Sequence, residues 1–152
     1  MIQRKQTIFL LIAAISSVVC LCMPIGTFRP VSLGVDSHIY NLWIQDGNGT
    51  LDYGSCPLFF ILLFNAVISV YTIFLYKKRK LQMKLCRYNN LLVLIWYATY
   101  AAIVMTAKSD SLSDFRPGFA AVLPLVSLIL TVMARRGVKA DEALIRAAER
   151  IR

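Results

Sequence analysis

The chain has 152 residues, of which 58% are hydrophobic and only 16% are charged. Soluble domains carry about 25% charged residues, so this composition argues against a soluble domain, and its apolar content excludes an intrinsically disordered chain. The 17 Lys and Arg residues outnumber the eight Asp and Glu residues and give a net charge of +9, which is typical of contact with a membrane surface or with nucleic acid.

Four stretches without Asp, Glu, Lys or Arg predict four transmembrane helices. A helix needs about 20 mainly apolar residues to cross a hydrocarbon core about 30 Å thick. The stretches also lack the polar face that a helix of a soluble protein turns to water. We therefore predict an all-α membrane protein with a single domain, 1–152, and a four-transmembrane-helix bundle whose spans cover about residues 7–27, 55–76, 88–107 and 117–134.

The first stretch follows Arg4 and Lys5, as the apolar part of a secretory signal peptide would. Its apolar run is longer than the roughly 7–15 residues of a signal peptide, and no small-x-small cleavage site follows it. We therefore expect an uncleaved first helix.

The outer loop over residues 28–54 predicts a small antiparallel sheet. The turn-forming residues Asp46–Gly49 lie between Leu42-Trp43-Ile44 and Thr50-Leu51, a pattern typical of a β-hairpin. The alternating residues 31–35 predict a third strand. His38 shows no recognisable metal-ligand spacing with the aspartates of the loop, so we expect an exposed loop histidine and no metal site.

The distribution of basic residues predicts that both termini are cytoplasmic. Fourteen of the 17 Lys and Arg residues fall on the side of the termini, and three fall on the side of the outer loop. Lys and Arg are retained on the cytoplasmic side. The membrane thus explains the net charge, and we expect no nucleic-acid partner. The run from Lys77 to Lys80 is then a topology signal, and juxtamembrane clusters of this kind also attract anionic lipid headgroups.

Cysteines and polar residues near the spans supply few candidates for chemistry. An oxidising exterior permits a disulfide from Cys56 to Cys22 or Cys20, whereas a role as small buried hydrophobic residues is the alternative for Cys20 and Cys22. No charged residue lies inside a span, which argues against a pump or an ion-coupled transporter. Asn65, midway along the second span, is expected to form an interhelical polar contact.

Residues 138–152 predict a basic amphipathic helix on the cytoplasmic side, separated from the fourth span by a break at Gly137. Its apolar stripe includes Leu144, Ala148 and Ile151, and its polar side includes Arg146 and Arg150. We expect this tail either to lie on the inner leaflet or to dock a partner protein. The leaflet is the simpler expectation, because it requires no further protein.

The chain begins with MIQRKQTI (residues 1–8) and ends with ARRGVKADEALIR (residues 134–146) and ERIR (residues 149–152). With the four spans between them, these segments resemble the domain-of-unknown-function 4293 family of small bacterial integral membrane proteins. The resemblance covers the full chain. It implies a location in the bacterial inner membrane with a periplasmic outer loop, and it brings no catalytic residue.

Three functions are compatible with the sequence. The lack of catalytic groups beside a structured loop and tail favours a non-enzymatic scaffold or accessory subunit, without a cofactor, whose partners are the lipid bilayer and a membrane protein or a second copy. A small oligomeric transporter or channel is the second, and its path would be lined by Asn65, Tyr97, Thr99, Tyr100, Ser127 and Thr131. A membrane thiol or lipid enzyme is the third, with Cys20, Cys22 and Cys56 as its only candidates.

Overall fold

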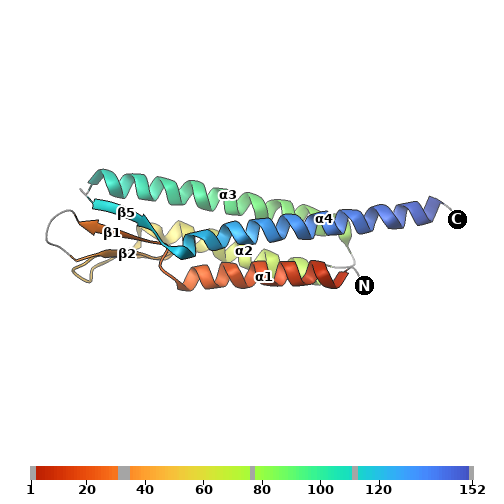
Figure 1. Ribbon diagram of the computed structural model, residues 1–152, viewed down its shortest axis with the longest axis horizontal. Coiled ribbons are helices and arrows are strands. Elements are labelled where there is room, and N and C mark those ends of the chain that lie inside the picture. The colour runs from red at the N-terminus through yellow and green to blue at the C-terminus, as the bar shows by residue number, and fades with distance from the viewer. Residues whose placement is uncertain (1–2, 31–34, 76–77, 111–112, 151–152) are drawn as a thin grey trace.

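The computed structural model describes residues 3–30, 35–75, 78–110 and 113–150. Within these residues, four helices run along one long axis: α1 (Gln3–Cys22), α2 (Cys56–Phe74), α3 (Arg79–Asp110) and α4 (Leu123–Arg150). Strands gather at one end of the molecule, and both chain ends lie at the other end (Figure 1). The predicted set of four helices is confirmed.

The helices form an antiparallel bundle in which sequence neighbours pack side by side. α1 packs on α2 and α4, and α3 packs on the same two helices. The short connection from Phe74 to Arg79 favours this arrangement for α2 and α3, because α3 returns beside the helix before it. The longer connections at the other end contain the strands of the sheet. The sheet therefore caps one end of the bundle (Figure 1).

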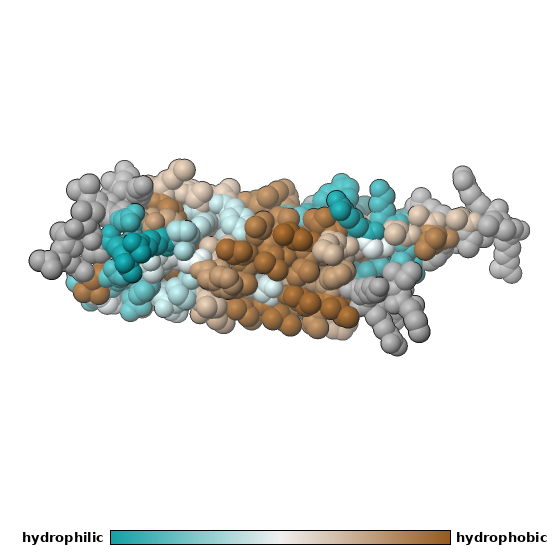
Figure 2. Space-filling view, viewed as in Figure 1, coloured by the Kyte–Doolittle hydropathy of each residue, from teal (hydrophilic) through white to brown (hydrophobic). Residues whose placement is uncertain are grey.

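An apolar surface surrounds the middle of the bundle. Among the described residues, three helical segments are long and apolar enough to cross a membrane: Tyr53–Phe74, Arg79–Ala107 and Phe119–Leu144. α1 contains a shorter apolar helix over Gln6–Cys22. Figure 2 shows a hydrophobic band across the middle of the visible face, between polar residues toward both ends. The exposed side chains include Phe64, Leu94 and Ile129. Soluble monomers rarely expose so large an apolar patch, so this is the architecture of a multi-pass membrane protein.

The cap is an antiparallel sheet with the strand order β4-β3-β2-β1-β5. Four of its strands come from the first outer loop: β1 (Gly26–Pro30), β2 (Ser37–Ile39), β3 (Ile44–Gln45) and β4 (Leu51–Asp52). The fifth, β5 (Ser113–Pro117), comes from the connection between α3 and α4 and pairs with β1. Both outer connections of the bundle are therefore joined in one sheet.

The predicted hairpin is confirmed. β3 pairs with β4, and the backbone N–H of Asp46 donates to the Thr50 carbonyl over 3.0 Å. The N–H of Gly49 closes the turn on the Asp46 carbonyl at 2.8 Å, and Gly49 has a φ of +79°, which glycine adopts without steric cost. The third strand expected over residues 31–35 falls mostly on residues 31–34, outside the described part of the chain; Val35 lies outside any strand.

Two helices differ from the predicted spans at their outer ends. α1 ends at Cys22, before Pro24, and residues 26–27 belong to β1, because proline ends a helix and disfavours the helical conformation of the residue before it. α4 begins at Leu123 after β5 and a short 3₁₀ turn, Phe119–Val122. The outer ends of the predicted spans therefore belong to the cap.

The break predicted at Gly137 does not occur, and α4 continues as one helix to Arg150. A Cβ atom at position 137 would lie 3.1 Å from the Gln6 Cγ atom of α1. The glycine is therefore needed for the close approach of α1 and α4, and this packing offsets its cost of about 1 kcal/mol in helix propensity.

The interior is hydrophobic at both ends and polar in the middle. The cluster under the sheet contains Ile25, Ile39, Leu62 and Trp96, and a smaller cluster near the chain ends contains Leu10, Cys86 and Ala134. Polar side chains, all buried, lie along the helices between them: Ser17, Asn65, Ser69, Asn89, Ser127 and Thr131.

Candidate functional site

The sheet has one buried and one exposed face, because side chains alternate along a strand. Phe28 and Ile39 lie on the buried face and pack against the helix ends. The register places Gln45, His38, Thr27 and Arg116 in one row across the other face. We call this row and its charged neighbours the polar face; its members are Thr27, Arg29, Asp36, His38, Gln45, Asp114 and Arg116.

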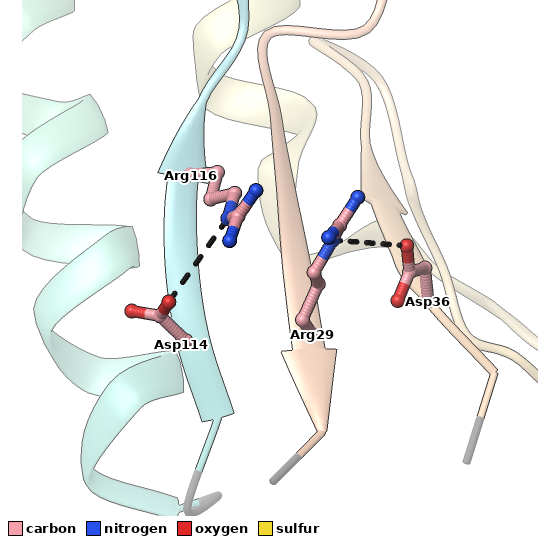
Figure 3. A network of polar contacts seen from close by, with 4 residues as sticks. All are labelled: Arg29, Asp36, Asp114 and Arg116. Carbon is pink, nitrogen blue, oxygen red and sulfur yellow. Dashed lines mark ion pairs between the residues drawn. The ribbon is translucent and has the colours of Figure 1, made fainter.

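The charged residues of the polar face form two ion pairs (Figure 3). Arg29 Nε lies 3.3 Å from Asp36 Oδ2, and Arg116 Nε lies 4.0 Å from Asp114 Oδ2. All four side chains are between 42% and 74% exposed. Exposed pairs contribute about 0–1 kcal/mol, so another molecule can replace these contacts at little energetic cost.

His38 lies in the middle of this face, between Thr27 and Gln45. Its ring is half-buried, and its Nδ1 atom is buried without a hydrogen-bond partner among the described residues. The expected exposed loop histidine is therefore partly enclosed by the sheet.

Asn41 connects the sheet to the bundle. Its side chain is fully buried, and its Nδ2 donates to the Cys20 carbonyl over 2.7 Å. This carbonyl lies in the last turn of α1, where the helix offers no partner of its own. The Asn41 Oδ1 atom accepts a hydrogen bond from Trp96 Nε1 of α3 at 3.1 Å. One side chain thus binds the outer loop to two helices.

The backbone of Ile25 forms a second connection. Its N–H donates to the Ile39 carbonyl over 2.8 Å, and its carbonyl accepts from the Gly118 N–H and the Tyr100 hydroxyl, each at 2.9 Å. The Tyr100 ring stacks on Trp96 with the centroids 5.2 Å apart. The polar face is therefore presented on a support that hydrogen bonds and aromatic packing hold to the bundle.

The structure places Asn65, the expected interhelical contact, in a buried polar network. Its Oδ1 accepts from the Ser17 hydroxyl at 2.9 Å, and its Nδ2 donates to the Asn89 carbonyl at 3.1 Å. Asn89 Nδ2 donates in turn to the Ser69 hydroxyl at 2.7 Å. The Ser17 hydroxyl also lies 3.4 Å from Ser127 Oγ, so the network joins all four helices of the bundle. Asn89 Oδ1 is buried without a partner among the described residues.

The four cysteines, all within the described residues, are free thiols. The thiol of Cys20 is buried and donates to the Ala120 carbonyl at 3.2 Å, and that of Cys56 donates to the Leu42 carbonyl at 3.5 Å. Cys22 is exposed. In the structure the Cys20 and Cys56 thiols each face a backbone carbonyl, and the disulfide that the sequence permits from Cys56 to Cys22 or Cys20 stays a prediction.

At the end opposite the sheet, Gln6 Nε2 donates to Asp141 Oδ2 over 2.6 Å, and both side chains are buried. The end of α4, drawn in blue, projects past the other helices along the bundle axis (Figure 1). Contact of this tail with the leaflet or with a partner protein stays a prediction. Leu144 is 62% exposed. The other predicted tail residues, Arg146, Ala148, Arg150 and Ile151, have side chains outside the described part of the structure.

A family model described as "Domain of unknown function (DUF4293)" matches residues 2–151. No curated protein matches the chain.

Proposed function

The chain belongs to the DUF4293 family, and from that premise we propose that it is a scaffold or accessory subunit of the bacterial inner membrane, without enzymatic activity. The observation that carries the proposal is the polar face of the outer sheet. On this account the polar face contacts a partner protein on the periplasmic side, and both termini are cytoplasmic.

The positions of the charges support this orientation. In the sequence, fourteen of the 17 basic residues fall in the segments on the side of the termini. Only Arg29, Lys108 and Arg116 fall on the other side, and two of them belong to the polar face. Positively charged segments resist translocation, so the sheet would be the translocated end.

The polar face has the properties of a protein-docking surface. Its ion pairs are weak and exposed, whereas its support is buried and hydrogen-bonded. A rigid surface loses little conformational entropy when a partner binds, which favours affinity. Interfaces with mixed charges select their partner by electrostatic complementarity. Arg29, Asp36, Asp114 and Arg116 supply both signs of charge.

The buried network supports a packing role for the polar residues of the bundle. Ser17, Asn65, Ser69 and Asn89 bond to one another or to backbone carbonyls. Hydrogen bonds between helices stabilise membrane bundles. The same side chains in a channel would line a continuous path and bond to water or to the transported molecule. We therefore favour the scaffold over the transporter.

Site-specific photocrosslinking tests this function. A photoreactive residue at Gln45, which is exposed on the polar face, should give one discrete crosslinked product in intact membranes. The product should disappear in a variant with Arg29→Ala and Arg116→Ala. It should persist in the control variant Asn48→Ala, which changes an exposed turn residue at the same end of the molecule. A yield that is equal in both variants would contradict docking through the polar face.

A further inference from the structure

One face of α3 is basic at its beginning and apolar along the rest. Lys80, Lys84 and Arg87 are spaced four and three residues apart, which places them on the same side of a helix, and all three are exposed. The same spacing continues through exposed residues along α3: Leu91, Leu94, Ala98, Ala102 and Met105. We call these eight residues the α3 stripe.

The length of the stripe matches the full hydrocarbon core together with the headgroups on one side. Residues 88–107 rise about 30 Å at 1.5 Å per residue, the thickness of a hydrocarbon core. The distance along the helix from Lys80 to Arg87 is about 10 Å, which covers the headgroup layer of about 5–8 Å on one side. Lys and Arg side chains also extend toward headgroups while their methylene groups stay in contact with apolar surface. The three basic residues therefore lie at headgroup depth, directly in line with the apolar part.

The two ion pairs that the structure gives between described side chains are both in the outer sheet, and neither involves Lys80, Lys84 or Arg87. Asp141 at the same end of the bundle is buried and bonded to Gln6 of α1. An anionic group at the surface of α3 would thus meet three positive charges without competition from these carboxylates.

We propose that the α3 stripe binds one anionic phospholipid of the inner leaflet. The phosphodiester contacts Lys80, Lys84 and Arg87, and an acyl chain follows Leu91, Leu94 and Ala98, which lie in the half of the core next to these basic residues. The choice of leaflet rests on the orientation given under the proposed function. This site differs from the Lys77–Lys80 run of the sequence. Its basic residues share one face of a helix, whereas those of the run are consecutive in sequence.

Native mass spectrometry of the full chain in mild detergent tests the site, with phosphatidylglycerol and phosphatidylcholine as probes. The test variant carries Lys80→Ala, Lys84→Ala and Arg87→Ala. The control variant carries Lys78→Ala, Arg136→Ala and Lys139→Ala, exposed basic residues at the same end but off the stripe. We expect the wild type and the control to retain phosphatidylglycerol in preference to phosphatidylcholine. The test variant should lose at least tenfold in this preference, since each basic residue near an anionic surface contributes roughly a factor of five.

Three results would overturn the proposal: an unchanged preference in the test variant, an equal loss in both variants, or displacement of bound phosphatidylglycerol by inorganic phosphate. An equal loss would mean that net charge alone attracts the lipid. If the test variant does not fold, the single variants Lys84→Ala and Lys84→Arg replace it, and only the alanine variant should weaken lipid binding. The lipid preference in detergent depends on neither the polar face nor a partner, so its failure is distinguishable from failure of the crosslinking experiment.

Discussion

Trp96 on α3 donates its indole N–H to the side-chain oxygen of Asn41 over 3.1 Å, at the level where the outer sheet meets the helices. Both side chains are fully buried. Because Asn41 also donates to the Cys20 carbonyl, the pair connects a loop residue to two helices. This contact therefore helps to hold the polar face in position relative to the bundle.

Replacing Asn41 by leucine should therefore destabilise the protein. Leucine has the same branching and the same number of side-chain heavy atoms, but it leaves the Trp96 N–H and the Cys20 carbonyl buried without partners, at about 1–3 kcal/mol for each group. We expect a lower midpoint of thermal unfolding in detergent and a change in tryptophan fluorescence. The exposed change Asn48→Leu is the control and should stay within about 0.5 kcal/mol of the wild type. Equal unfolding midpoints for the two variants would contradict the role of Asn41.

Asn65→Leu should weaken the packing of the bundle without preventing membrane insertion. The change removes the acceptor of the Ser17 hydroxyl and the donor to the Asn89 carbonyl. Interhelical hydrogen bonds in membranes contribute about 0.6 kcal/mol on average and up to about 1.7 kcal/mol. Unfolding in sodium dodecyl sulfate should show a loss of about 1–2 kcal/mol for this variant. Val67→Ala, at an exposed position of α2, should show a smaller loss. The reverse order would mean that the network contributes nothing to stability.

Gly137→Leu should separate α1 from α4 at the end that holds the termini. A Cβ atom there already approaches Gln6 Cγ to 3.1 Å, and a leucine adds three more carbons. We expect a loss of stability of about 1–3 kcal/mol from overpacking. Combining it with Gln6→Ala should recover part of this loss, because the smaller side chain makes room. If Gly137 were a flexible break, the effects of Gly137→Leu and Gln6→Ala on stability would be additive. Gly137→Leu alone would then increase the helix content.

The hydropathy pattern predicts the helices because lipid requires about 20 consecutive apolar residues, a signal that is local in sequence. The hairpin is predicted for a similar reason, since its turn needs particular residues at Asp46–Gly49. β5 has no such signal: its sequence SDFRP becomes a strand only by pairing with β1, more than eighty residues earlier. That register also brings Arg29 and Arg116 onto one face, which no local pattern indicates.

The sequence also does not identify the side chains that connect distant elements. Trp96 lies within an apolar span, where an indole is read as one more hydrophobic residue. Asn41 precedes Trp43 in what looks like an exposed loop. Asp141 belongs to a charged tail in the sequence, but the unbroken α4 turns it toward Gln6. Each role depends on a tertiary contact, and periodicity alone does not identify the partner.

Labelling of single cysteines with a membrane-impermeant maleimide, in a variant whose four native cysteines are replaced, tests whether both outer connections lie on the side of the membrane opposite the termini. Gln45 on β3, Asp114 on β5 and Leu144 on α4 are exposed positions for the new cysteine. In intact spheroplasts, Gln45→Cys and Asp114→Cys should be labelled, whereas Leu144→Cys should be labelled only after the membrane is permeabilised. Labelling of Gln45→Cys and Asp114→Cys from opposite sides would contradict a shared outer sheet, and labelling of Leu144→Cys in intact spheroplasts would contradict the cytoplasmic position of α4.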